Sequence, residues 1–274
     1  MAIANNNETN KLTTKRLSIQ IGLSGLSFCI LDVSANTITY FKQFKKERNL
    51  TPLELLDYLK FVIDTEGFKQ KNFDQILVIY RNELSTLVPK LLFDEDNLAD
   101  YIKFNNKILP TDFITFDELN DDIINVYVPL VNINNFIYDT FGAFVYKHFS
   151  TVFIEQVKNR NRNFQEKRMY VNVEDSLFET LVLDGDKLIY SNTFSFNTKE
   201  DFIYYILFTS EQLKMNTENF PLFLYGEIDE TSEFFEIAYK YIRHVAIGKL
   251  DLEYKIQPEL NDSKINYVLA NSFT

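Results

Sequence analysis

Residues 168–196, RMYVNVEDSLFETLVLDGDKLIYSNTFSF, hold three successive strand patterns. Apolar and β-branched residues predict strands at 168–174, 177–183 and 188–196. Asp184-Gly185-Asp186 has the composition of a tight turn between the last two. Further predicted elements are a helix from about Thr198, a strand at 221–225, a helix at 231–241 and a strand at 245–250. The second half of the chain therefore predicts the order β-β-β-α-β-α-β.

The first half predicts the same order. Strand patterns cover 17–21, 26–33 and 37–44, and Thr51, Pro52 and Glu54 form the capping box of a following helix. An apolar run at 76–80 is typical of a buried strand. We assign the fourth strand of the repeat to 123–128, its second helix to 132–141 and its last strand to 144–148.

Spacings between matched positions locate an insertion. Ile19 and Val171 are 152 positions apart, whereas Val126 and Leu222 are 96 apart. The difference predicts about 50 extra residues in the first half, at about 82–122, after the first helix. The predicted organisation is a disordered tail at 1–15, a first lobe at 16–160 and a second lobe at 161–274. A helix capped by Ser150 and a polar linker at 158–168 join the lobes.

Composition narrows the classes of function. The chain carries 39 acidic and 28 basic side chains, a net charge of −11 that disfavours nucleic-acid backbones and anionic membranes as partners. No apolar run reaches the length of a membrane span, and the polar start lacks a secretion signal. The single cysteine, Cys29, excludes an internal disulfide and a Cys-rich metal site. These features predict a soluble, cytoplasmic protein without a metal centre.

The tandem units carry a resemblance. Two β-β-β-α-β-α-β units of RNase H type, with a helix between them, resemble the actin, sugar-kinase and heat-shock ATPase superfold, an α/β class with mixed sheets. Segments 84–97, 127–129 and 148–151 further resemble an uncharacterised bacterial family with an actin-like ATPase fold, a domain of unknown function. Pilus-platform and cell-division actin homologues are similar at a greater distance.

The resemblance implies an ATP site between the lobes, with Mg²⁺ held by an Asp on each leading strand and phosphates held by glycine-rich turns. In the first turn Gln20 stands where the family pattern has Asp, although Gly22, Ser24 and Gly25 remain. Gln is a poor ligand for a hard cation. The first turn therefore predicts weakened metal binding.

The second turn and the adenosine motif depart further from the pattern. Asn172 replaces Asp and Glu174 replaces a loop glycine, while Asp175 and Ser176 follow. In the adenosine motif Gly226 remains and Glu227 takes the place of the second glycine. A carboxylate directed into a phosphate site repels the ligand. The three motifs together predict a degenerate nucleotide site.

Three functional hypotheses remain open. In the first, the protein has lost catalysis and binds a protein partner through the insertion. In the second, it is a divergent ATPase or kinase-like enzyme that binds Mg-ATP through the following residues: Gly22, Ser24, Gly25, Asp175, Ser176 and Gly226. In the third, the basic segment 158–168 contacts RNA. Homo-oligomers are compatible with each.

The two histidines, His148 and His244, fall on equivalent strands of the two halves. We expect His148 to be a hydrogen-bonded structural residue because the fold separates these strands. The acidic run 117–122 is a candidate interaction surface within the insertion.

Overall fold

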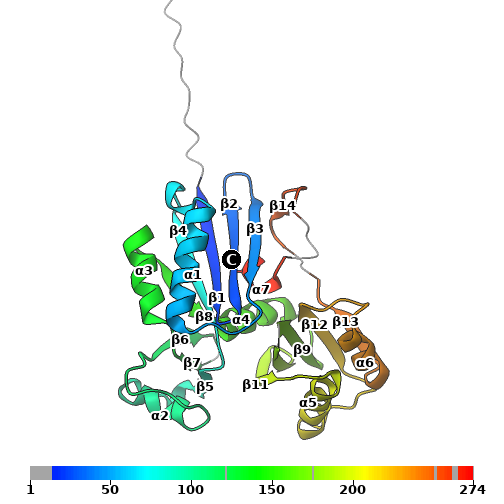
Figure 1. Cartoon of the computed structure of the whole chain (residues 1–274). Helices are drawn as coiled ribbons and strands as arrows, with labels where there is room; N and C mark the ends of the chain where they lie inside the picture. Colours follow the sequence, from blue (N-terminus) through cyan, green and yellow to red (C-terminus); the bar gives the residue numbers. More distant parts are fainter. Residues whose placement is uncertain (1–13, 121, 175, 250–251, 261–264, 274) are drawn as a thin grey trace, which may run out of the picture.

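The computed structural model describes residues 14–120, 122–174, 176–249, 252–260 and 265–273. Two mixed sheets form two lobes, and helix α4 (Phe149–Asn161) lies between them (Figure 1). Of the predicted tail, residues 1–13 lie outside the described residues, and Lys15 already belongs to the first strand.

The first lobe has a six-stranded sheet of order β14-β3-β2-β1-β4-β8. Its strands are β1 (Lys15–Gly22), β2 (Gly25–Asp32), β3 (Thr37–Lys45), β4 (Gln75–Arg81), β8 (Val145–His148) and β14 (Lys255–Ile256). Helices α1 (Pro52–Thr65) and α3 (Val131–Phe141) pack together beside it. The predicted capping box of α1 is confirmed, because the Thr51 and Glu54 side chains each accept a backbone N–H. Phe28 and Phe68 stack within the core beneath these helices.

The second lobe repeats this order with the sheet β11-β10-β9-β12-β13. Its elements are β9 (Lys167–Glu174), β10 (Leu177–Asp184), β11 (Lys187–Ser195), α5 (Lys199–Gln212), β12 (Pro221–Gly226), α6 (Glu233–Tyr241) and β13 (His244–Ile247). Apart from β14, the strand order of one sheet superposes on that of the other. The chain is thus a duplicated unit, as the strand and helix patterns predicted.

The assignment of the fourth strand to 123–128 was wrong. Ile19 of β1 pairs in parallel with Val78 of β4, just as Val171 of β9 pairs with Leu224 of β12. The fourth strand is therefore β4, and the insertion follows it. The inserted subdomain, residues 82–128, contains β5 (Ser85–Pro89), α2 (Leu98–Lys103), β6 (Thr115–Leu119) and β7 (Ile123–Tyr127). Its three strands make a separate sheet of order β5-β7-β6.

Asp117 attaches the inserted subdomain to α4. Its carboxylate accepts the His148 backbone N–H at 2.8 Å, the Thr151 hydroxyl at 2.7 Å and the Tyr127 hydroxyl at 3.1 Å. A carboxylate is favoured at the positive N-terminal end of a helix. Asp117 is therefore a half-buried anchor of the subdomain, with its carboxylate directed at α4. The N-cap of α4 is His148, whose Nδ1 accepts the Ser150 N–H, so Ser150 does not cap the helix.

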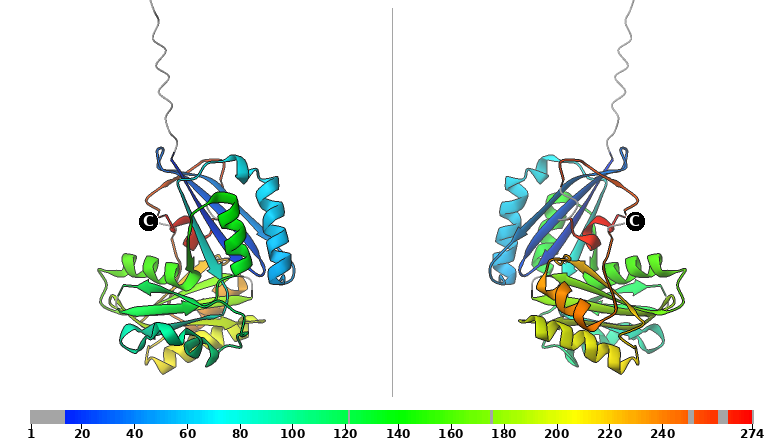
Figure 2. Two further views of the ribbon diagram at one scale, coloured as in Figure 1. Left: turned by 90° about the vertical axis from the view of Figure 1, so that its left-hand side faces the viewer. Right: turned by 90° about the vertical axis from the view of Figure 1, so that its right-hand side faces the viewer.

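The C-terminal segment returns to the first lobe. β14 pairs with β3, and helix α7 (Tyr267–Ala270) packs against β1, β2 and α4. Both views in Figure 2 show α7, in red, beside the blue strands of the first lobe. Arg16 donates to the Phe273 carbonyl at 3.0 Å. The predicted second lobe, which ran to residue 274, therefore differs from the structure in its last part.

We predict that Phe153→Ala lowers the free energy of unfolding by about 3–5 kcal/mol, measured by urea denaturation. Phe153 is fully buried on α4, and its ring lies 6.1 Å from Tyr225 and 6.3 Å from Tyr267. Its removal leaves a cavity where both lobes meet. The control is Phe61→Ala on α1, where the side chain is 63% exposed and the change should stay within about 0.5 kcal/mol. Equal losses in the two variants would contradict the central role of α4.

Candidate functional site

A cavity of about 340 Å³ lies in the cleft between the lobes. Four of the residues predicted from the resemblance line it: Gly22, Ser24, Gly25 and Ser176. They come from the β1–β2 and β9–β10 turns, which the duplication places opposite each other. Gly226 is not part of this lining, and Asp175 lies outside the described residues. The fold therefore assembles most of the predicted site in one place.

Two of the retained glycines are required by backbone packing. A Cβ on Gly25 would lie 2.4 Å from the Phe44 carbonyl oxygen of the adjacent strand β3. Gly226 has a φ of +87°, and a Cβ there would lie 2.0 Å from the Val173 carbonyl oxygen. Both positions need glycine whether or not a phosphate approaches, so their retention is not evidence for nucleotide binding.

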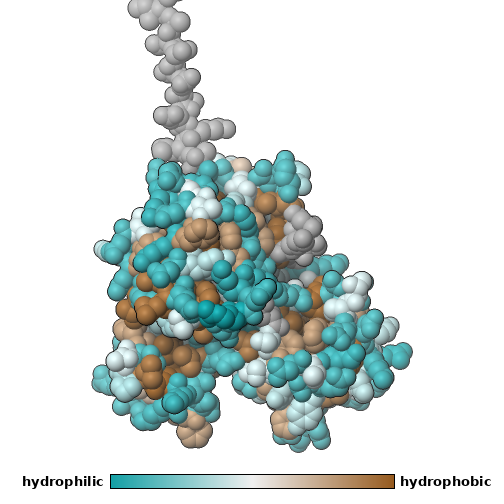
Figure 3. Space-filling model, viewed as in Figure 1, coloured by the Kyte–Doolittle hydropathy of each residue, from teal (hydrophilic) through white to brown (hydrophobic). Residues whose placement is uncertain are grey.

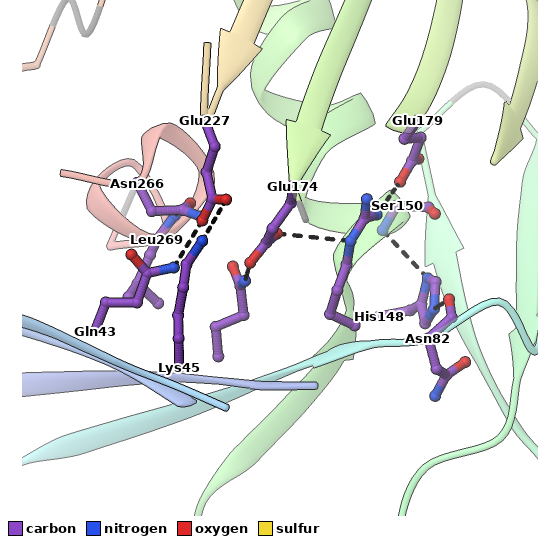
Figure 4. Close-up of polar contacts among 12 residues, drawn as sticks. Gln43, Lys45, Asn82, His148, Ser150, Glu174, Glu179, Glu227, Asn266 and Leu269 are labelled. Carbon is purple, nitrogen blue, oxygen red and sulfur yellow. Dashed lines mark hydrogen bonds and ion pairs between the residues drawn. The ribbon is translucent and has the colours of Figure 1, made fainter. Parts of the chain in front are cut away.

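The two substituted positions of the phosphate turns contact each other. Gln20 Nε2 donates to Glu174 Oε1 at 2.6 Å, so an amide from the first lobe holds a carboxylate from the second. Glu174 points into the cleft and lines the cavity together with Gln20 (Figure 4). A hydrogen bond to a charged group stabilises by about 1.5–3 kcal/mol. The Asp-to-Gln and Gly-to-Glu departures therefore form one interlobe contact.

Arg81 extends this contact into the second lobe. It ends β4, its Nε lies 3.7 Å from Glu174 Oε2, and its Nη1 donates to Glu179 Oε2 at 2.9 Å. The guanidinium also lies 4.0 Å from the centroid of the Phe149 ring. Burial raises the pKa of the fully buried Glu179 carboxyl, and the nearby Arg81 charge offsets part of that shift.

A second contact between the lobes lies at the segment that corresponds to the adenosine motif. Glu227, which stands where the motif has a second glycine, forms an ion pair with Lys45 of β3. Gln43 Nε2 donates to the other oxygen of the same carboxylate at 2.9 Å. Figure 4 shows both side chains reaching Glu227 from the first lobe. Glu174 and Glu227 are thus both bound by groups of the opposite lobe.

Asn172 has a different position from the one that the motif implies. It is fully buried on β9, and it is not part of the lining of the interlobe cavity. Neither atom of its side-chain amide has a hydrogen-bond partner among the described residues.

The sequence did not indicate Arg81 or Glu179, although both are central to the site. The signal for Arg81 was its position, a charged residue directly after the apolar run of a buried strand. Glu179 lies between Phe178 and Thr180 in β10, opposite Asn172 in the β9–β10 ladder. A buried charge requires a partner. Which partner it meets depends on the other lobe.

The basic segment 158–168 is part of the folded structure. Helix α4 continues to Asn161 and β9 begins at Lys167, so the predicted linker is shorter than expected. Arg160 donates to Asn271 Oδ1 at 2.8 Å, and Arg168 pairs with Glu166 and lies over the Phe164 ring. Cations engaged in this way are less available to a phosphate backbone.

The described residues offer no group of three or more His, Cys, Asp or Glu side chains arranged to hold a metal ion. His148 is buried at the end of β8, whereas His244 is exposed at the start of β13. No helix in the described part of the chain has the length and apolar character that a bilayer crossing requires.

A family model matches residues 4–245. The chain belongs to the family of proteins of unknown function DUF3822. No curated protein matches the sequence significantly. The resemblance to an uncharacterised family is thus confirmed.

Solved structures establish the fold. A protein with actin-like ATPase fold and unknown function from Bacteroides thetaiotaomicron is 20% identical, with a TM-score of 0.78 over 94% of this chain and 96% of that one. A chain of the PilM-PilN type IV pilus biogenesis complex is 10% identical, with a TM-score of 0.57 over 93% of this chain and 95% of that one. The DUF3822 chain therefore has the actin-like ATPase fold, as its repeated units predicted.

We predict that His148 makes stability depend on pH. Burial, and then the Arg81 charge, lower the pKa of His148 from 6.5 to about 3. The unfolded chain therefore binds the proton that the folded chain excludes, and stability falls as pH drops below about 6.5. Urea denaturation should show a loss of about 2 kcal/mol from this group between pH 7 and pH 5.

The matched variant is His148→Asn, which keeps an oxygen that can accept the Ser150 N–H at the N-cap. It lacks the titrating imidazole, so its stability should fall less steeply over the same pH range. Parallel pH profiles for the two proteins would show that His148 is not the titrating group.

Proposed function

We propose that the protein is a non-catalytic binding protein of actin-like fold that acts in the cytoplasm by holding a protein partner. The observation that supports this most is the 2.6 Å hydrogen bond from Gln20 to Glu174. It joins the two turns between which relatives of this fold place the phosphates of ATP. In this chain, a side-chain contact thus links the two turns at one wall of the interlobe cavity.

The charges of the cleft also favour this proposal. Phosphoryl transfer requires Mg²⁺ near the phosphates, and Gln20 is a poor ligand where the pattern has a carboxylate. Glu174 adds a negative charge that a phosphate would meet at short range. Arg81, the cation best placed to offset it, is already engaged by Glu174 and by Glu179. The residues present therefore fit a closed interlobe contact better than Mg-ATP.

The proposed partner surface lies on the inserted subdomain. Large apolar side chains gather there without a covering element, and Figure 3 shows them at its lower left. These are the exposed residues with their exposed fractions: Leu91 96%, Leu92 70%, Phe104 88%, Leu109 59% and Phe113 50%. Several large apolar side chains exposed on one subdomain favour a site of interaction. We call this set the apolar surface of the inserted subdomain.

We predict that millimolar Mg-ATP does not raise the melting temperature of the wild-type protein. Tight binding at a hundredfold excess over Kd would add about 2.7 kcal/mol, which is several degrees for a chain of this size. Differential scanning fluorimetry measures the shift, with Mg²⁺ and inorganic phosphate as the control for general salt effects. A rise of several degrees specific to Mg-ATP would support the rival function, a nucleotide-dependent enzyme.

A second prediction concerns the partner surface. A photo-crosslinking amino acid placed at Phe104, expressed in the native cell, should give a discrete crosslinked product after irradiation. The same group at Tyr239, exposed on α6 of the second lobe, is the matched control and should give none. Equal labelling from both positions, or none from Phe104, would remove the apolar surface of the inserted subdomain from the proposal.

A further inference from the structure

In the described part of the chain, two strand edges that pair with no further strand face each other across a groove. A cavity of about 510 Å³ is lined by Ser85, Thr86 and Leu87 of β5 and by residues 191–193 and 195 of β11. Both strands are terminal in their sheets. Figure 1 shows β5 and β11 on opposite sides of the gap between the inserted subdomain and the second lobe, and Figure 3 shows the surface hollowed there. The groove adjoins the interlobe cavity, because Glu83 and Ser195 line both.

The hydrogen-bond pattern between β10 and β11 determines which backbone N–H and C=O groups of β11 face this groove. The Phe196 N–H donates to the Ser176 carbonyl, which fixes the pair Ser176 and Phe196 as hydrogen-bonded. In an antiparallel ladder such pairs alternate with non-hydrogen-bonded ones. The pairs Phe178–Phe194 and Thr180–Asn192 are therefore bonded, whereas residues 191, 193 and 195 turn N–H and C=O outward. These three residues line the groove.

By the same reasoning, β5 has fewer backbone N–H groups that point outward and lack a partner strand. The Val128 N–H donates to the Leu84 carbonyl, so Thr86 and Val88 bond to β7 while Ser85 and Leu87 turn outward. The Ser85 N–H already donates to the Glu83 carbonyl, and Pro89 has no N–H. Leu87 therefore offers the main outward donor of β5, and β11 is the edge better suited to accept another strand.

The duplication shows what covers the corresponding edge in the other lobe. β3 and β11 hold the same place in the repeat, and in the first lobe β14 pairs with the outer edge of β3. Among the described residues no strand pairs with the outer edge of β11. Natural proteins protect free edges with charges, proline or bulges, yet residues 188–195 contain neither a charge nor a proline. The one bulge, near residue 182, lies beyond the groove residues.

We propose that an extended segment of a partner protein adds as a strand to the outer edge of β11. Residues 191, 193 and 195 supply main-chain hydrogen bonds, and β5 forms the opposite wall. The lining is rich in Ser, Thr and Asn side chains, and Glu83 is its one charged member in the described part of the chain. The segment is therefore neutral or basic and carries small, hydrogen-bonding side chains. This inference rests on the proposed binding function and names the kind of partner.

The test uses the full chain and a random linear-peptide library displayed on phage. Peptides selected on the wild-type protein are synthesised, and hydrogen exchange is measured with and without them. The amides of Ser191, Thr193 and Ser195 should gain protection, while those of Asn192 and Phe194, already bonded to β10, should not change. Protection confined to other parts of the chain, or a library without binders, would overturn the proposal.

A pair of variants tests the backbone contact itself. Thr193→Pro removes one outward N–H and leaves the ladder to β10 intact, so peptide affinity should fall about tenfold or more in fluorescence anisotropy. Thr193→Ala keeps the N–H and should bind like the wild type. Equal affinity of both variants would overturn the proposal.

A second measurement does not depend on how Thr193→Pro folds. Two versions of each peptide are compared, one N-methylated at the odd residues and one at the even residues. Only one version should bind, because only one set of the peptide's N–H groups faces β11. Indifference to the phase of methylation would refute strand addition. Nucleotide binding is measured separately. A rise in melting temperature with Mg-ATP would refute the proposed function, even if peptides protect the amides of β11. A lack of protection by peptides would refute only the strand-addition inference.

Discussion

The buried Arg81 side chain is the interaction on which the arrangement of the lobes depends. It leaves β4 of the first lobe and meets Glu174 and Glu179 on two strands of the second. Its side chain is 7% exposed, so its charge has little water to stabilise it and requires both carboxylates. Removing one partner from such a cluster costs far more than a surface ion pair would. This requirement ties the first lobe to two strands of the second.

Substitutions at the nucleotide motifs are consistent with that constraint. An Asp at position 20 would repel Glu174, whereas Gln20 donates a hydrogen bond to it. Glu227 likewise gains Lys45 and Gln43 from the opposite lobe. Both glutamates thus have a polar partner on the opposite lobe. In this chain, polar contacts join the two lobes across the cleft.

Duplicated units need not receive identical surroundings. The edge of β3 is covered by a strand that arrives from the end of the chain, and the edge of β11 faces a groove. The inserted subdomain forms the other wall of that groove, because Asp117 fixes it to the start of α4. Insertion and duplication together create a surface that neither unit has alone.

Local patterns in the sequence determined the elements, since a capping box, a turn or an apolar strand depends on neighbours within a few residues. They also determined the duplicated order and, through the resemblance, the places of Gln20 and Glu174. Only the tertiary structure decided which sheet each strand joins. The pattern of residues 123–128 fits a strand of the repeat as well as a strand of the insertion. The parallel pairing of Ile19 with Val78 shows that β4 is the fourth strand of the repeat. The partners of Arg81 and Glu174 were likewise undetermined, because they lie about a hundred or more residues apart and meet only when the lobes close on each other.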